Sequence, residues 1–375
     1  MSKIPSEISD IVIDYLHSDR DALAACALVC KEWLPGSRYH LFYTIWVNEQ
    51  NFQQFLDTLN TPRCFWRRHV RHLHMTGIRR YTISWLCDAN LAKLSTLEAV
   101  DQLSLRNLDG YDDTQVARLS ATLPGVKELR ISHCHFQSLP HCMCMITPFS
   151  LKRLTLEENT YHNVTLTEPP IEWMHNPNVI HLRSLLHREI CVIGKFLQFL
   201  GPSITHLYLA RPHFLRRYCS DGTSVCATQS LPTNQYAGMY YAINLAHNTN
   251  LRCLHFGRIK LNELSGSHWK APLVWMEMVL SQITSSQMEE LRFWIEVDFY
   301  HDLNRIDWDM LARLFAQPCF SGLKILHFDV QRFGYVNVNS AGEWIRHQLL
   351  ACDARGILTI YDMPPVRFQE SRLGG

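Results

Sequence analysis

The sequence lacks most of the features that mark a membrane protein, a secreted protein or an enzyme. It has no run of 18 apolar residues, so no membrane-spanning helix is expected. Its first residues include Lys3, Glu7 and Asp10 but no hydrophobic core of the kind that a secretory signal needs. It also has no P-loop, no G-x-S-x-G and no H-E-x-x-H motif, so none of these common catalytic signatures points to an enzyme.

An excess of charge of either sign is absent as well. The 375 residues include 36 Lys and Arg against 35 Asp and Glu, so the net charge is +1 and no global field favours nucleic acid or a membrane. Thirteen cysteines in a chain without a secretory signal are expected to be reduced thiols, not a disulfide framework. The composition therefore predicts an intracellular protein, cytoplasmic or nuclear, with a small module and one large domain.

The first positive signal lies in residues 4–47. Helical spacing after Pro5 predicts a short amphipathic helix that carries Ile8, Ile11, Val12, Tyr15 and Leu16. A second helix is expected over residues 19–33, with Ser18 as its N-cap. Its apolar residues surround the axis, because Leu28 and Val29 point away from the face that carries Leu23, Cys26, Cys30 and Trp33. So little chain cannot bury this surface alone, and a helix of this kind needs a second protein surface.

The order of residue types in this stretch resembles an F-box. Ile4-Pro5 stands where the family has Leu-Pro, the second helix follows the family's L..C.LVC..W run, and His40-Leu41-Phe42-Tyr43 matches its closing segment. The resemblance implies binding to a Skp-type adaptor and, through it, to a cullin–RING ubiquitin ligase. The residues that it implies for the adaptor contact are Ile4, Pro5, Ile8, Ile11, Leu16, Leu23, Leu28, Val29, Cys30, Trp33 and Leu41. The alternative is an ordinary helical hairpin that packs on the rest of the chain.

A repeated pattern of the form Leu-x-x-Leu-x-Leu follows. Copies begin at Val70, Val100, Val126, Leu151, Val179, Ile204, Leu251, Met288 and Leu323, and the copy at Val179 is the weakest. Alternate apolar residues predict a short strand buried on one side, and helical patterns lie between several of the strands. Strand plus helix at a regular period is typical of a repeat solenoid. The alternative is an ordinary α/β fold with buried strands.

The repeats resemble the irregular leucine-rich repeats that often follow an F-box, notably in large fungal families, with Asn107, Cys134 and Asn159 as remnants of the Asn/Cys ladder. The expected fold is α/β: a helical F-box followed by an irregular leucine-rich-repeat solenoid. The expected divisions are residues 1–47 for the F-box, 48–69 for a linker with a helix, 70–363 for the solenoid and 364–375 for a loose tail. Residues 220–234 are rich in Ser, Thr, Gly and Pro and predict an exposed loop.

In a leucine-rich repeat, the residue between the last two apolar positions of each strand points to the open face. This rule and the flanking positions predict target contacts at Arg106, Arg130, Arg153, Arg183, Tyr208, His255, Arg292, Trp294 and His327. Arginines at equivalent positions of three repeats, Arg130, Arg183 and Arg292, favour an acidic or phosphorylated target segment. The alternative is that any solvated strand face carries polar residues.

Two further clusters have simpler explanations. A group of histidines and cysteines lacks the paired spacing of a closed zinc site, so neither a metal nor a cofactor is expected; its members are His133, Cys134, His135, His141, Cys142 and Cys144. Residues 63–80 are basic and contain no acid, but a solvated first repeat explains them better than nucleic acid does.

The sequence thus predicts a non-catalytic substrate receptor of an SCF-type ligase. A repeat scaffold or inhibitor without a ligase role is the second hypothesis, and a metal- or thiol-dependent enzyme is the third.

Overall fold

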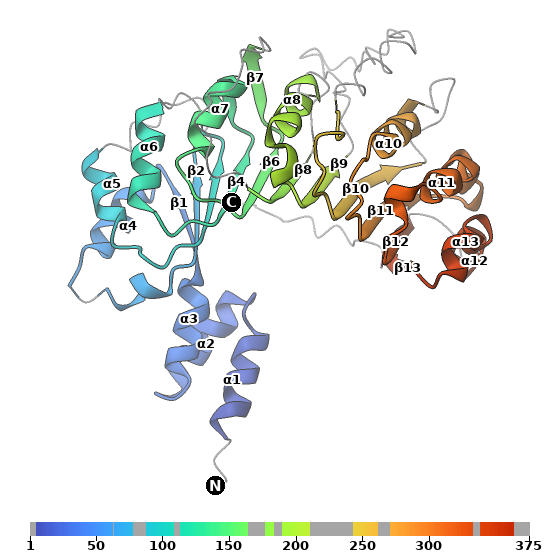
Figure 1. The fold of residues 1–375 in the computed structure, drawn as a ribbon. Helices are drawn as coiled ribbons and strands as arrows, with labels where there is room; N and C mark the ends of the chain where they lie inside the picture. The colour runs from blue at the N-terminus through green and yellow to red at the C-terminus, as the bar shows by residue number, and fades with distance from the viewer. Residues whose placement is uncertain are drawn as a thin grey trace, which may run out of the picture. The chain divides into compact units, whose positions relative to one another are not determined.

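The structure is a computed structural model, and it describes residues 5–62, 64–77, 88–108, 113–163, 177–183, 190–210, 243–261, 271–332 and 338–363. The chain forms two compact units, Met1–Pro177 and Asn178–Gly375 (Figure 1). Ile4, the predicted loop at 220–234 and the predicted tail at 364–375 lie outside the described residues.

The first unit begins with three helices: α1 (Ser6–Tyr15), α2 (Arg20–Val29) and α3 (Leu34–Tyr43). The prediction of one helix over residues 19–33 was wrong, because Cys30 takes an extended backbone with φ −159° and ψ 169° and ends α2. A new helix, α3, begins at Leu34, and Pro35 lies in its first turn, where proline is tolerated. The N-cap of α2 is Asp19 and not Ser18, since the Asp19 carboxylate accepts a hydrogen bond of 2.9 Å from the Ala22 N–H.

A parallel sheet in strict chain order follows in the first unit. Its strands are β1 (Thr44–Asn48), β2 (His72–Thr76), β3 (Gln102–Arg106), β4 (Glu128–Ser132) and β6 (Arg153–Glu157). The connections carry α4 (Phe52–Leu59), the 3-10 helix η1 (Phe65–His69), α5 (Asp88–Leu94), α6 (Asp113–Thr122) and α7 (Leu139–Ile146). A small parallel sheet pairs β5 (His135–Ser138) with β7 (Thr160–Asn163). Helices α4 to α7 lie on one side of the main sheet (Figure 1).

The second unit repeats this architecture. Its parallel strands, also in chain order, are β8 (Val179–Arg183), β9 (His206–Ala210), β10 (Cys253–Lys260), β11 (Glu290–Val297), β12 (Ile325–Arg332) and β13 (Leu358–Met363). The helices between them are α8 (Ile190–Leu200), η3 (Gly201–Ser203), α10 (Ala271–Ser281), η5 (Tyr300–Arg305), α11 (Trp308–Phe315), η6 (Pro318–Phe320), α12 (Val338–Gln348) and α13 (Leu350–Ala354).

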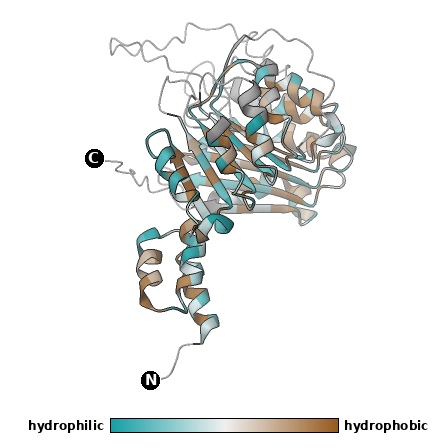
Figure 2. Ribbon diagram, turned by 90° about the vertical axis from the view of Figure 1, so that its left-hand side faces the viewer, coloured by the Kyte–Doolittle hydropathy of each residue, from teal (hydrophilic) through white to brown (hydrophobic). Residues whose placement is uncertain are grey.

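The predicted apolar positions form the core of each unit. In the second unit the central leucines Leu207, Leu254, Leu291 and Leu326 are in register and 0% exposed. In the next apolar row of that sheet, three neighbouring strands carry phenylalanine: the Phe293 ring stacks between two neighbours, 5.2 Å from Phe256 and 5.0 Å from Phe328. The strand ribbons in Figure 2 alternate between hydrophobic and hydrophilic residues. The α/β class is therefore confirmed, together with all nine predicted strands.

Strands β1, β5, β7 and β13 and helices α3, α5, α7 and α13 were not predicted. Because β1 pairs with β2, residues 44–47 belong to the sheet and not to the helical module.

Two assignments within the repeats were wrong. Strand register places Ile180, not Leu182, beside Leu207, so His181 takes the position that was predicted for Arg183. In the ladder, Cys134 and Asn159 are correctly placed: the Asn159 Oδ1 accepts the Cys134 N–H at 3.0 Å and its Nδ2 donates to the Ile131 carbonyl at 3.0 Å. Asn107 lies one residue before the position in its repeat that corresponds to Cys134 and Asn159, and it takes a left-handed φ of 51°.

Candidate protein-binding surfaces

The first candidate surface is an apolar face on α1 and α2. Leu28 is 88% exposed and Tyr15 85% exposed, and Ile11 and Val29 are each exposed by more than half. Figure 2 shows the hydrophobic stretches of these helices. Large apolar side chains at such exposure, clustered on two short helices, are typical of a surface that another protein covers.

The remaining apolar residues of the three helices pack inward and fix this face. Ile13 and Leu23 are buried between the helices, and Cys26 is nearly so. The His40 Nε2 lies 2.8 Å from the Asp14 Oδ1, so α3 and α1 are joined by a polar contact as well. The module thus has a small core of its own and several exposed apolar side chains.

The predicted adaptor contacts divide by burial. Pro5, Ile8, Ile11, Leu28, Val29 and Cys30 are exposed, and Leu16, Trp33 and Leu41 are half-buried. Leu23 is 0% exposed, so its assignment as a contact residue was wrong: it supports the face from inside. Cys30 is exposed just beyond the end of α2.

An aromatic seam joins α3 to the start of the sheet. The Phe42 ring stacks on Trp66 of η1 at 5.5 Å and meets the Phe65 ring edge-on at 5.8 Å. The Arg38 guanidinium lies 4.1 Å from the centre of the Phe65 ring. Since β1 also follows α3 without a linker, the helical module is fastened to the first strands at two points.

The open side of the sheet in the first unit begins with a stacked pair of rings. Trp46 and His74 are register partners whose ring centres lie 3.9 Å apart with planes 8° from parallel. Burial lowers the pKa of His74 to about 4, and the nearby His72 and Arg130 add to this effect, so the imidazole is neutral at pH 7. The Trp46 side chain remains 58% exposed and was missed, because β1 itself was not predicted.

Three of the predicted arginines already hold carboxylates. Arg130 is ion-paired with Glu157 of the neighbouring strand. The Arg153 Nη1 lies 2.9 Å from Glu128, and Arg292 binds Asp329 through two contacts of 2.6 and 3.2 Å. These charges are balanced within the fold, which reduces their capacity to attract an anionic target.

Arg106 differs from the other predicted arginines. It is exposed at the end of β3, and it makes no ion pair within the described parts of the chain. Arg183 ends β8, and its side chain lies outside the described residues. Arg106 is thus available to a partner, although it is not one of the three arginines at equivalent repeat positions.

The open side of the second unit is a row of rings and charges. His181 stacks on Tyr208 at 3.8 Å, and Tyr208 meets the His255 ring edge-on at 4.3 Å. The row continues to Arg292 and His327, and the His327 Nε2 lies 2.9 Å from the Asp329 Oδ1. Burial would raise the pKa of Asp329, but hydrogen bonds from Arg292 and His327 bring it below its usual value.

Burial increases toward the carboxyl ends of these strands. Glu296 and Gln331 are register partners on the open side, yet they are 1% and 0% exposed. Arg258 sits at a bulge in β10 with φ 34°, and its Nε reaches Glu296 at 2.5 Å while the guanidinium lies 5.7 Å from the Trp294 ring. The Trp294 indole N–H donates to the Gln331 Oε1 at 3.2 Å. At this end of the sheet, the buried polar side chains of Glu296 and Gln331 are bound by Arg258 and Trp294.

No group of three or more His, Cys, Asp or Glu side chains within the described segments is arranged to hold a metal ion. Cys134 and Cys142 are buried, and the side chain of Cys144 lies outside the described residues. Burial raises the pKa of the Cys253 thiol to about 11, and Glu290 adds to this effect, so Cys253 is not an activated nucleophile.

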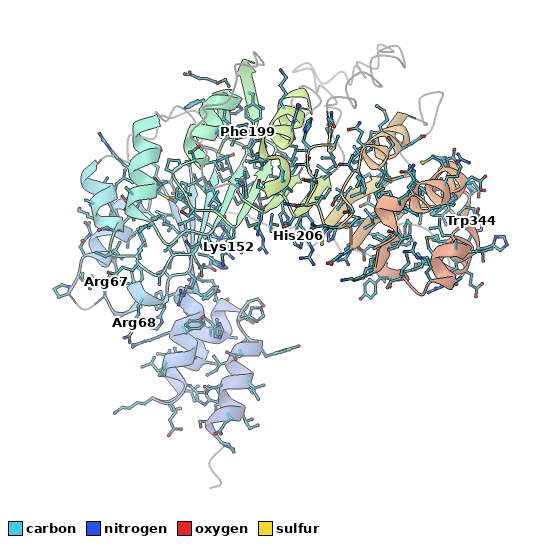
Figure 3. The ribbon with its side chains drawn as sticks, viewed as in Figure 1. Arg67, Arg68, Lys152, Phe199, His206 and Trp344 are labelled. Carbon is cyan, nitrogen blue, oxygen red and sulfur yellow. The ribbon has the colours of Figure 1, made fainter. Side chains whose placement is uncertain are left out.

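The basic segment predicted at 63–80 is only partly described. Figure 3 shows Arg67 and Arg68 on η1, beside α3, and the Arg67 Nε donates to the Cys64 carbonyl at 3.1 Å. Among the described helices, none is long and apolar enough to cross a membrane.

No protein-family model matches this chain, and no curated protein matches it. The functional argument therefore depends on the surfaces themselves.

Proposed function

We propose that this protein is the substrate-recognition subunit of an SCF-type cullin–RING ubiquitin ligase. In this proposal, α1 to α3 form an F-box that binds a Skp-type adaptor, and the strands that follow form an irregular leucine-rich-repeat solenoid whose open side binds a target protein. The observation that carries the proposal is the exposed apolar face of α1 and α2, with Leu28 at 88% and Tyr15 at 85% exposure.

The organisation of the strands supports the solenoid part of the proposal. In each unit every strand of the main sheet pairs in parallel with the strands before and after it in that sheet, in chain order, and helices lie in most of the described connections. One-dimensional stacking of strand–helix units is characteristic of repeat solenoids, which commonly present an extended binding surface.

The proposed role requires no catalytic group in this chain. A receptor accelerates ubiquitin transfer by holding the target near enzymes carried by other subunits, so its contribution is proximity. That contribution depends on a fixed path from adaptor to target. The seam between Phe42 and Trp66 supports such a path, because it fastens the helical module to the first strands.

The second hypothesis is a repeat scaffold or inhibitor with no ligase role. It shares the open side of the sheets but gives no role to the apolar face of α1 and α2. Retention of the adaptor therefore separates the two hypotheses.

The test is a double substitution, Leu28→Asp with Val29→Asp, in the full chain. Two charges placed in an apolar interface lose solvation without gaining partners, so adaptor retention in a co-purification should fall below detection. Leu350→Asp is the matched control, because Leu350 is 61% exposed on α13 and far along the chain from the helical module. Wild-type adaptor retention by a folded double mutant would contradict the proposal.

A further inference from the structure

An exposed indole and an exposed guanidinium share the open side of the first unit: the indole has one face on His74, and the guanidinium makes no ion pair within the described residues. Trp46 lies on β1 and Arg106 on β3. Strand β2 lies between these two strands and carries His74 and Thr76. We propose that Trp46 and Arg106 form a subsite for an extended protein segment that carries an aromatic side chain and, two to four residues away, an anionic one. This inference rests on the proposed function and names the class of target.

Trp46 is prepared to receive a flat side chain. One face of its indole is covered by His74 at 3.9 Å, and this stacking restricts rotation of the ring. The rest of the Trp46 side chain is accessible to a partner, since the residue is 58% exposed. A large ring that is already held in place loses little conformational entropy when a partner stacks on it. Trp is among the residue types that most often dominate protein interfaces.

The backbone of β1 keeps Trp46 on this side of the sheet. The Asn51 Nδ2 donates to the Trp46 carbonyl at 3.2 Å, and the Asn51 Oδ1 accepts the Asn48 N–H at 2.8 Å. Val47 is 2% exposed and packs into the core. The alternation of a strand then places Trp46 on the opposite, open side.

Charge selects the second element of the partner. Arg130 and Arg153 lie on adjoining strands of the same sheet and are neutralised by Glu157 and Glu128. Arg106 is exposed and has no such carboxylate within the described residues, so it is the cation from this group that an incoming anion would meet. A guanidinium matches the two oxygens of a carboxylate or a phosphate in a bidentate pair.

The spacing of the two side chains sets the spacing of the ligand. Two steps between strands and two residues along a strand separate the Cα atoms of Trp46 and Arg106 by about 12 Å. An extended segment advances about 3.3 Å per residue, so side chains two to four residues apart, with the reach of an arginine, span this gap. The subsite therefore fits a short linear segment and does not require a folded partner.

The test uses the purified full chain and a displayed library of random peptides, and adaptor retention is measured separately. We expect enriched peptides to carry Phe, Tyr or Trp with Asp or Glu two to four residues away. A synthetic representative should bind Trp46→Ala and Arg106→Gln at least about tenfold more weakly than the wild type. Arg130→Gln is the matched control, since its charge is already paired with Glu157, and its affinity should stay within about threefold.

Replacing the acidic residue of the representative by Gln should reproduce the loss, and phosphoserine at that position should retain or improve binding. The subsite is overturned if no peptide is enriched, if the enriched peptides lack the acidic residue, or if Arg106→Gln binds as tightly as the wild type.

These outcomes are separable from the fate of the ligase proposal. Adaptor retention without peptide binding would remove the subsite and leave the proposed function standing. Peptide binding without adaptor retention would remove the proposed ligase function and leave the subsite standing.

Discussion

At the scale of the residue, His74 couples the stability of the first unit to pH. Its folded pKa of about 4 lies below the ordinary 6.5, so the unfolded chain binds more protons between these values. The free energy of unfolding therefore gains a contribution as pH rises from about 4 to 6.5, and this contribution is lost again on acidification. For a half-buried ring screened by solvent, it should be of the order of 1 kcal/mol.

We expect His74→Phe to keep the stack on Trp46 and to flatten this pH dependence, as measured by urea unfolding at pH 7 and pH 5. The same change at His347, which is exposed on α12, should leave the dependence as it is in the wild type. An unchanged slope for His74→Phe would show that the ring is not kept neutral by its surroundings.

Single residues also show where prediction from sequence reaches its limit. The resemblance to an F-box placed Leu28 and Leu23 in one set of contacts, but Leu28 is 88% exposed and Leu23 is 0% exposed. Residue type and helical spacing define an apolar face, whereas burial depends on which face α3 covers. Likewise, the sequence predicted Arg130 and Arg106 on the open side, but only the fold brings Glu157 to Arg130.

At the scale of the element, the edge of β1 needs explanation, because an unpaired strand edge invites pairing with another chain. Asn51 occupies that edge: its amide makes two hydrogen bonds with β1, at 3.2 Å to the Trp46 carbonyl and at 2.8 Å from the Asn48 N–H. A side-chain amide thus takes the place of a neighbouring strand.

Asn51→Ala should lower the free energy of unfolding by about 1 to 2 kcal/mol, because two backbone groups lose their partners. It should also increase self-association, which light scattering at rising protein concentration would detect. Gln50→Ala is the control, since the Gln50 side chain is exposed in the same turn. Equal behaviour of the two variants would mean that the edge is protected in another way.

Strands were predicted well and their register less so. A period of two with buried leucines is a strong local signal, which is why nine strands were predicted correctly. The copy at Val179 was shifted by two residues because Ile180 and Leu182 preserve the alternation in either register, and only pairing with Leu207 and Leu209 decides between them. Strand β1 was missed because its residues were assigned to the end of the helical module.

At the scale of the whole molecule, the proposed function places binding at two separate surfaces, and a ligase receptor must transmit position between them. Within the first unit, the connection runs through the seam of Phe42, Phe65 and Trp66. The seam could not be predicted from the sequence as a contact, since its rings come from α3 and η1, which are separated by β1 and α4. Proximity accelerates transfer only when the target is held in a favourable position.

Phe42→Leu should therefore separate binding from transfer. Leucine keeps the seam apolar but removes the stack on Trp66, which is worth about 0.5 to 1.5 kcal/mol beyond area burial. We expect adaptor retention and peptide binding to persist, hydrogen exchange in α1 to α3 to rise, and ubiquitin transfer to a bound peptide fused to a lysine-bearing carrier to slow. Phe299→Leu is the matched control, because Phe299 is 57% exposed just before η5 and lies outside the seam. If Phe42→Leu transfers ubiquitin at the wild-type rate while hydrogen exchange in α1 to α3 rises, rigidity of this junction is not what the receptor contributes.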